Sequence, residues 1–360
     1  MRNIGDSVAS VRPGVEVTIE REPVGVVGLI TPWNFPIAIP AWKMAPALAF
    51  GNTVVMKPAE LTPGCAWELA RILEQAGCPE GVFNLVMGPG SQVGARIVEH
   101  PDIAAVSFTG SVATGRQVAI ECATHGKKVQ LEMGGKNPMV VVDDADLDVA
   151  VGASLNGAFF STGQRCTASS RLIVTKGIHD AFLDKLTAAA ADLVVGDPLD
   201  PKTQIGPVVD QSQMDQNMRY LALASEEGCD VRGGGLGNGN GFFMHPAIFA
   251  GATNAMRVSR EEIFGPMTSI IKVDDYDEAL AVANDTDFGL SSGICTTSLK
   301  LASHFRRHAK AGMVMVNLPT AGVDYHVPFG GRKGSSYGPR EQGSYAREFY
   351  TTVKTSYIAP

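Results

Sequence analysis

One cysteine lies in a stretch of chain that a scaffold could hold rigidly toward a substrate. Cys166 follows residues 145–160, which have helical character after a cluster of aspartates, and precedes the β-branched run 171–175. A thiolate in such a loop can act as a nucleophile if nearby donors or cations lower its pKa. A lone cysteine is more often a small buried hydrophobic residue. Cys166 is therefore a candidate nucleophile that needs partners elsewhere in the chain.

Two polar residues could supply the partner chemistry. Glu132 ends an apolar run and is followed by two glycines, so its carboxylate could face a cleft. Burial that raised its pKa toward neutrality would make it a general base, and the alternative is a solvated carboxylate at a strand end. Asn34 lies in a proline-bounded turn, where its amide could donate to an oxyanion or form an Asx-turn.

Two segments have the pattern of a nucleotide site. In residues 103–115 a strand-like run reaches Gly110 and Ser111 and then a helix, whose N-terminal amides could bind a pyrophosphate. The spacing is not G-x-G-x-x-G, so Gly110 could instead only cap a turn. Lys57 ends another strand-like run, and Glu60 follows it. Together they could hold ribose hydroxyls, or form a surface ion pair.

These residues fall on strands and helices that alternate along the chain, which predicts an α/β fold with doubly wound parallel sheets. A second alternating series begins at residue 139 and predicts a second α/β domain. The first series has strands at 24–30, 52–57, 82–87, 103–108 and 128–132 and helices at 40–50, 65–76, 91–99 and 111–123; the second has strands at 139–142, 172–175, 268–273, 291–295 and 313–317.

Two alternating segments lie outside this series, residues 15–22 and 350–358. We expect them to pair with each other and to extend a partner subunit's sheet. The glycine-rich run 233–241 lacks the lysine and helix start of a phosphate loop, so we interpret it as a flexible surface loop. The predicted domains are 1–23, an oligomerisation arm or linker; 24–134, a Rossmann-type dinucleotide-binding domain; 135–343, a catalytic domain; and 344–360, a C-terminal oligomerisation strand.

The composition limits the possible partners. The chain has 360 residues, 45% of them hydrophobic, and a net charge of -7, which disfavours a general nucleic-acid binder. Six cysteines without a C-x-x-C pair favour a reduced, cytoplasmic protein with no thiolate metal site. Neither a signal peptide nor a membrane span is indicated. A small molecule is the expected ligand.

Several short motifs follow one another along practically the whole chain. They are Thr31-Pro32-Trp33-Asn34-Phe35-Pro36, Lys57-Pro58-Ala59-Glu60, Phe108-Thr109-Gly110-Ser111, Leu131-Glu132-Met133-Gly134-Gly135-Lys136-Asn137-Pro138, Gly163-Gln164-Arg165-Cys166, Glu261-Glu262-Ile263-Phe264-Gly265-Pro266 and Pro328-Phe329-Gly330-Gly331. In type and order these motifs resemble those of the aldehyde dehydrogenase superfamily. Family members normally carry a helical segment ahead of the Pro-Trp-Asn motif, so we expect a chain shortened at its N-terminus.

The resemblance implies a mechanism and site residues. Cys166 would attack an aldehyde while Asn34 and the Cys166 amide hold the oxyanion, hydride would pass to NAD or NADP, and Glu132 would activate water to hydrolyse the thioester. No metal is expected. The remaining residues implied are Lys43 and Glu341 as a proton-relay pair; Thr31, Pro32, Trp33, Lys57, Glu60, Gly110, Ser111, Gly134, Glu262 and Phe264 around the cofactor; and Phe329 near the substrate.

The C-terminal run 322–343 resembles the branch that oxidises 2-oxoglutarate semialdehyde (2,5-dioxopentanoate), with succinate semialdehyde as the alternative substrate. Arg165 could pair with a substrate carboxylate or form a structural ion pair. A homodimer or homotetramer is expected. Two other readings stay open: an inactive truncated homologue that binds a dinucleotide, and a thioesterase or esterase that uses Cys166 and Glu132 without hydride transfer.

Overall fold

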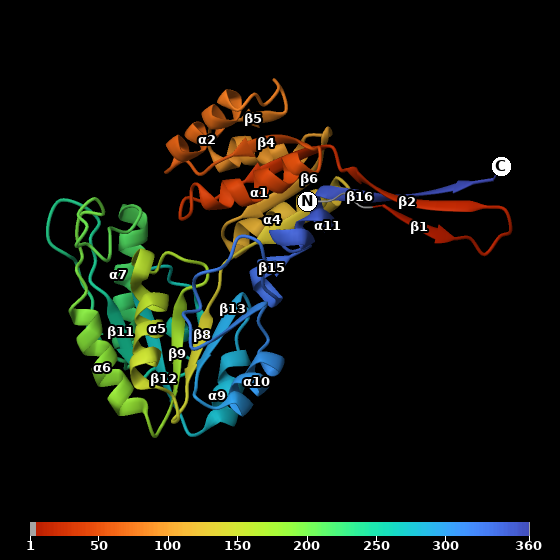
Figure 1. Cartoon of the computed structure of the whole chain (residues 1–360). Helices are drawn as coiled ribbons and strands as arrows, with labels where there is room; N and C mark the ends of the chain where they lie inside the picture. The colour runs from red at the N-terminus through yellow and green to blue at the C-terminus, as the bar shows by residue number, and fades with distance from the viewer. Residues whose placement is uncertain (1–4, 360) are drawn as a thin grey trace. The chain divides into compact units, whose positions relative to one another are not determined.

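The computed structural model describes residues 5–359, which form two compact units (Figure 1). Unit 1 contains the described residues up to Met133, then Val323–Gly330 and the residues from Ser336 onward. Unit 2 contains Gly134–Gly322 and Gly331–Ser335. Each unit has its own sheet and its own cores.

Unit 1 is built on a six-stranded sheet in the order β15-β7-β6-β3-β4-β5. All neighbours are parallel except β15, which pairs antiparallel with β7. The elements of this sheet and its helices are β3 (Val26–Ile30), α1 (Ala38–Ala49), β4 (Thr53–Lys57), α2 (Pro63–Gln75), β5 (Phe83–Leu85), the π-helix η1 (Gly90–Gly94), α3 (Ala95–Glu99), β6 (Ile103–Thr109), α4 (Val112–Thr124), β7 (Lys128–Glu132), β15 (Ser336–Tyr337), the 3-10 helix η4 (Gly343–Ala346) and α11 (Arg347–Tyr350).

Alternate side chains of these strands enter two separate cores, as expected for a sheet covered on both faces. Leu29 packs with Met44 of α1 and Phe349 of α11 in one core. Phe108 packs with Val118 of α4 in the other. The ends of β4, β6 and β7, where Lys57, Gly110 and Glu132 lie, are thereby fixed by buried strands.

Unit 2 has a seven-stranded sheet in the order β10-β11-β12-β9-β8-β13-β14, parallel except for β10. Figure 1 shows α5 and α6 on one side of it and α9 and α10 on the other. The elements are β8 (Asn137–Val141), α5 (Leu147–Phe159), the 3-10 helix η2 (Phe160–Gly163), β9 (Ser169–Thr175), α6 (His179–Ala191), α7 (Gln211–Glu226), β10 (Asp230–Gly233), β11 (Ala247–Ala250), α8 (Arg257–Arg260), β12 (Met267–Val273), α9 (Tyr276–Asn284), β13 (Ser291–Cys295), α10 (Leu299–His308), β14 (Met313–Val316) and the 3-10 helix η3 (Lys333–Ser335).

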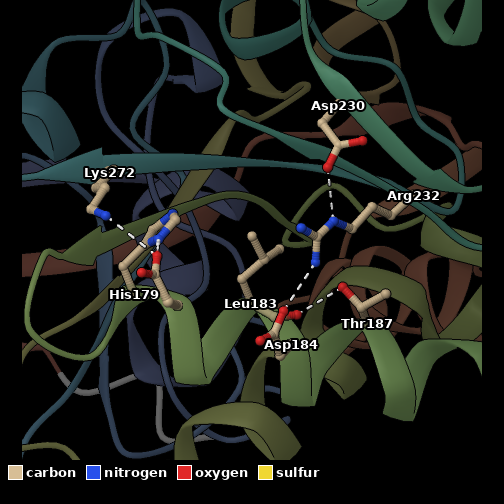
Figure 2. Close-up of polar contacts among 8 residues, drawn as sticks. His179, Leu183, Asp184, Thr187, Asp230, Arg232 and Lys272 are labelled. Atoms are coloured by element: carbon tan, nitrogen blue, oxygen red, sulfur yellow. Dashed lines mark hydrogen bonds and ion pairs between the residues drawn. The ribbon is translucent and has the colours of Figure 1, made fainter.

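The predicted α/β architecture with largely parallel sheets is confirmed, with local differences. The glycine-rich run 233–241 is not wholly a loop, because β10 enters it and pairs with β11. Figure 2 shows how β10 is held to α6: Arg232 donates to Asp184 of α6 at 3.3 Å and to Asp230 at 3.0 Å. The sequence pattern did not predict β10 or β11, because each strand spans only four residues beside glycines or prolines. The helix expected at 91–99 begins instead as the π-helix η1.

The two alternating end segments pair with each other, as predicted. β2 (Glu16–Pro23) and β16 (Thr351–Ile358) are antiparallel over their full lengths, and β1 (Asp6–Ala9) adds a third strand on β2. Figure 1 shows this ribbon extending away from the helices of unit 1. Its side chains are largely exposed, including Val353 and Tyr357. A two-sided exposed ribbon of this kind gains little from its own burial.

Candidate active site

Cys166 lies in unit 2, in the loop between η2 and β9. Ser161 and Thr162 before it have positive φ values of 53° and 59°, and Gly163 follows at 65°. Left-handed backbone in residues other than glycine is strained and persists only where the surroundings impose it. This loop is tightly packed against its surroundings, because a Cβ on Gly163 would lie 2.0 Å from the carbonyl oxygen of Gly265.

The nucleophile loop is also fixed from β8. The Asn137 amide donates to the Cys166 carbonyl at 2.8 Å and to the Ala168 carbonyl at 2.9 Å. A Cβ on Gly135 would lie 2.5 Å from the Cys166 carbonyl oxygen, so the Gly134–Gly135 turn packs directly against the loop. The Cys166 backbone is therefore held in one conformation, as a preorganised nucleophile requires.

Cys166 differs from three of the other cysteines in access. It is half-buried, whereas Cys122, Cys229 and Cys295 are buried. Burial raises the pKa of Cys122 to about 11 and of Cys295 to about 12, and it also raises the pKa of Cys229. A raised pKa disfavours the thiolate, so these three thiols are poorer nucleophiles.

Glu132 lies in unit 1 at the end of β7 and is 3% exposed. Burial raises its pKa well above the usual value, and the negative charge of Glu341 raises it further. The Ser336 hydroxyl opposes this shift by donating to the Glu132 Oε2 at 2.5 Å, as do the charges of Lys43 and Arg340. A buried carboxyl with a raised pKa can accept a proton near neutral pH, which is the requirement for a general base.

A buried ion pair lies within the electrostatic reach of Glu132. Lys43 of α1 donates to Glu341, and both side chains are almost fully buried. The Lys43 ammonium also donates to Ser107 of β6 at 2.7 Å, and Ser107 donates to Gln130 of β7 at 2.8 Å. Three elements of unit 1 and the segment after β15 thus contribute to one chain of polar groups behind the candidate base.

The nucleotide pattern at Lys57 and Glu60 also belongs to unit 1. Lys57 is buried at the end of β4, donates to the Pro58 carbonyl at 3.0 Å and lies 3.5 Å from Glu60. Glu60 is largely exposed and accepts from the Gly90 amide at 2.8 Å. A cavity of about 440 Å³ opens beside it, and its lining residues are Pro58, Ala59, Glu60, Pro63, Gly64, Trp67, Met87 and Gly88.

Close packing explains why glycine occurs at positions 110 and 115. A Cβ on Gly110 would lie 2.6 Å from the ring of Phe108, and one on Gly115 would lie 2.5 Å from the sulfur of Met133. Gly115 therefore lets α4 approach the sheet closely, and Gly110 leaves space for the Phe108 ring. Ser111 is the N-cap of α4, where its hydroxyl accepts from the Thr114 amide at 3.3 Å.

Glu262 lies in unit 2, against the turn that follows β7. The Gly135 amide donates to its Oε1 at 2.8 Å, and a Cβ on Gly134 would lie 2.0 Å from its Oε2. Burial raises the pKa of Glu262 to about 7, against the opposing effects of the Gly135 amide and Lys136. Burial and the charge of Arg171 lower the pKa of Lys136 to about 7. Gly134 is therefore required for space beside a carboxyl that titrates near neutrality.

Comparison with known proteins decides the family. The family model described as "Aldehyde dehydrogenase family" matches residues 1–356. The chain belongs to the aldehyde dehydrogenase family. It is 46% identical over 365 residues to an alpha-ketoglutaric semialdehyde dehydrogenase of Bacillus subtilis, covering 100% of this chain and 75% of that protein. It is also 46% identical to an alpha-ketoglutarate semialdehyde dehydrogenase of Haloferax volcanii, covering 96% of this chain and 72% of the relative.

The fold agrees with that of a solved aldehyde dehydrogenase. Betaine aldehyde dehydrogenase from Staphylococcus aureus, solved in complex with NAD+, has a TM-score of 0.96 to this chain at 35% identity. The alignment covers 99% of this chain and 71% of that structure. The oxidoreductase class and the Rossmann-type fold expected from the motifs are thus confirmed.

The structure also locates the motif residues Thr31 and Phe264 of this aldehyde dehydrogenase. The Thr31 amide pairs with the Lys57 carbonyl at 3.1 Å, which fixes the start of the loop that carries Pro32, Trp33 and Asn34. Phe264 has a φ of 61° in the loop after Glu262. The roles of these residues toward a cofactor or an oxyanion stay predictions.

The two residues predicted near the substrate have intramolecular contacts. Arg165 donates to the Asn156 side-chain oxygen at 3.2 Å, and burial lowers its pKa. Phe329 is buried, with its ring centroid 5.6 Å from that of Trp42. Its backbone forms an antiparallel bridge with Glu341. Phe329 therefore positions the segment that carries the buried glutamate.

Sequence reasoning missed Ser336, Arg340, Ser107 and Gln130 around the buried glutamates. None carries a signal in the local pattern, because each acquires its place through strand pairing or a helix packed from elsewhere in the chain. Within residues 5–359, no group of three or more His, Cys, Asp or Glu side chains has the proximity needed to hold a metal ion. In the same range, every helix is too short or too polar to cross a membrane.

Proposed function

We propose that this enzyme oxidises 2-oxoglutarate semialdehyde to 2-oxoglutarate, with NAD or NADP as the oxidant. The substrate is supported by the names of the relatives in Bacillus subtilis and Haloferax volcanii, each 46% identical to this chain. The observation that carries the chemistry is the buried Glu132, whose raised pKa suits a base that must deprotonate water near neutral pH.

The proposed reaction begins at Cys166. Its thiolate adds to the aldehyde carbon, and the Asn34 amide and the Cys166 backbone N–H stabilise the resulting oxyanion. Loss of hydride from the thiohemiacetal leaves a thioester on the cysteine. Glu132 then takes a proton from water as the hydroxyl adds to the thioester, and the carboxylate product leaves with the thiolate restored. The aldehyde is oxidised by two electrons.

The residues of unit 1 fit a dinucleotide, because the cavity beside Glu60 has the size and apolar lining of a small-molecule site. When bound, the nicotinamide cofactor supplies the hydride acceptor. Lys57 and Glu60 would hold its ribose hydroxyls, and the N-terminus of α4 at Ser111 would face its pyrophosphate. Glu262 would hold the second ribose. Glu60 favours NAD, while Lys57 and Ser111 are compatible with the extra phosphate of NADP.

Recognition of the carboxylate of the substrate is assigned to Arg165. Its planar guanidinium can donate two parallel hydrogen bonds to a carboxylate. Its Nη1 contact with Asn156 would orient it from the end of α5. The homodimer or homotetramer, the cytoplasmic location and the functional assignment of the domains remain predictions from the sequence.

The test is cofactor reduction by the 360-residue chain with 2-oxoglutarate semialdehyde, succinate semialdehyde and betaine aldehyde, each with NAD and with NADP. We expect the first substrate to give the highest kcat/KM and the Cys166→Ala variant to be inactive. Highest kcat/KM with another aldehyde would overturn the substrate assignment. Cofactor binding without turnover of any aldehyde would favour the hypothesis of an inactive homologue. Ester hydrolysis that needs no cofactor would favour the hypothesis of a thioesterase or esterase.

A further inference from the structure

Ser336 stands directly opposite Glu132 in the sheet of unit 1. The two residues are partners in the antiparallel pairing of β15 with β7, and Tyr337 is the partner of Leu131. The Ser336 hydroxyl donates to the Glu132 Oε2 at 2.5 Å. The candidate base therefore receives a hydrogen bond from a strand of only two residues.

The chain around this short strand is held firmly. Gly338 follows it at a φ of +87°, where a Cβ would lie 2.4 Å from the Val129 carbonyl oxygen. The Gln130 amide donates to the Pro339 carbonyl at 3.0 Å. These contacts bind the turn after β15 to β7, so the Ser336 side chain reaches Glu132 from a fixed backbone.

Several charges surround the same carboxyl. Lys43 of α1 and Glu341 form the buried ion pair, and Arg340 precedes Glu341. A Cβ on Gly330 would lie 2.6 Å from the Arg340 Nη1 and 2.7 Å from the Glu132 Oε1, so glycine leaves space for both groups. Tyr350 of α11, whose pKa is raised by burial, lies near Glu341. The Ser336 hydroxyl is a neutral donor that contacts the Glu132 carboxyl directly.

We propose that Ser336 is a positioning residue for Glu132, holding its carboxylate in the orientation and the charged state needed for thioester hydrolysis. This proposal rests on the proposed function, in which Glu132 activates the hydrolytic water. A hydroxyl that donates to a carboxylate stabilises the charged form, so it lowers the pKa that burial and Glu341 raise. Without the hydroxyl, a larger fraction of Glu132 would be protonated at neutral pH and unable to accept a proton.

The expected effect is confined to the second half of the reaction. Acylation and hydride transfer depend on Cys166, whereas hydrolysis depends on the charged Glu132. Ser336→Ala should therefore keep its first turnover, slow thioester hydrolysis about tenfold at neutral pH and accumulate acyl-enzyme. The pH of half-maximal hydrolysis should move upward. Ser336→Thr, which keeps a hydroxyl, should restore most of the rate.

The experiment measures NAD(P)H formation in the first turnover by stopped flow, and the acylated Cys166 by mass spectrometry after acid quench, from acid to alkaline pH. Tyr337→Phe is the matched control: it lies on the same strand, is 61% exposed and should behave as wild type. Unchanged hydrolysis and an unchanged pH profile in Ser336→Ala would overturn the proposal. Equal loss of acylation and hydrolysis, unrelieved in Ser336→Thr, would also overturn it, because it would indicate a general structural defect.

A titration separates failure of this proposal from failure of the proposed function. The carboxyl of Glu132 can be followed by 13C NMR in the unliganded protein, with Glu132→Gln to identify its signal. An upward shift of its titration in Ser336→Ala supports the contact even if the chain oxidises none of the aldehydes. An unshifted titration overturns the role of Ser336, whatever the turnover shows.

Discussion

Lys43 and Glu341 form an ion pair across 298 positions of the sequence, with side-chain exposures of 0% and 3%. Removing two charges from water is costly, and the mutual attraction offsets that cost only while both partners are present. Ser107 contributes a further hydrogen bond to Lys43 at 2.7 Å. The pair therefore links α1 to the segment after β15 and sets the charge environment of Glu132.

The pair predicts unequal effects of single and double substitutions. Lys43→Met alone leaves a buried carboxylate without its partner and should lower the free energy of unfolding by about 3–5 kcal/mol. Lys43→Met combined with Glu341→Leu removes both charges and should recover much of that loss. Urea unfolding of the three proteins checks this. A double variant less stable than the single one would contradict the argument.

Glu262 predicts a pH-dependent difference in stability. Its folded pKa, about 7, is raised above the unfolded value near 4.3, so its favourable contribution is complete below the unfolded pKa and is lost as the pH rises to about 7. Glu262→Gln keeps an acceptor for the Gly135 amide and carries no charge. Relative to wild type, this variant should gain on the order of 2 kcal/mol between pH 4.5 and 7. Urea midpoints at several pH values measure it, and a constant difference would refute the assignment.

Alkylation should distinguish the cysteines in the native protein. Iodoacetamide at neutral pH should modify Cys166 while sparing Cys122 and Cys295, because burial shields these two thiols and raises their pKa to about 11 and about 12. Peptide mass spectrometry measures the extent at each site. The urea-denatured protein is the control, in which all six cysteines should react. Native labelling of Cys295 as fast as Cys166 would show that the burial argument is wrong.

Two glycines of unit 2 predict opposite effects of the same substitution. Gly163→Ala places a Cβ 2.0 Å from the Gly265 carbonyl oxygen at a φ of +65°, so it should lower the free energy of unfolding by about 1–3 kcal/mol and slow any chemistry at Cys166. Gly152→Ala, within α5 and with nothing nearby, should stabilise by about 0.5–1 kcal/mol. Thermal or urea unfolding separates the two. Equal effects would mean that the close approach at Gly163 is relaxed in solution.

The pattern of residue types along the chain predicted those features of the fold that depend on residues close together in the sequence. Alternating strands and helices predicted the two α/β units, and strands such as β7 and β13 begin and end at the predicted residues. The same pattern failed for short elements. Strands β10 and β11 span four residues each, which is too few to show the alternation of a strand. The glycines at 134 and 163 were visible as motif letters, but their reason was not, since it lies in the atoms that a Cβ would meet.

The sequence by itself determined the family, the order of the elements and the candidate residues Cys166 and Glu132, because residue types and local periodicity carry that information. Tertiary structure alone decided what surrounds them. Ser336 contacts Glu132 only because β15 pairs with β7 in one register, and Asn137 holds the Cys166 carbonyl only because β8 lies beside that loop. Desolvation and the field of distant charges act through space, so the raised pKa of Glu132 follows from packing that no spacing along the chain reveals.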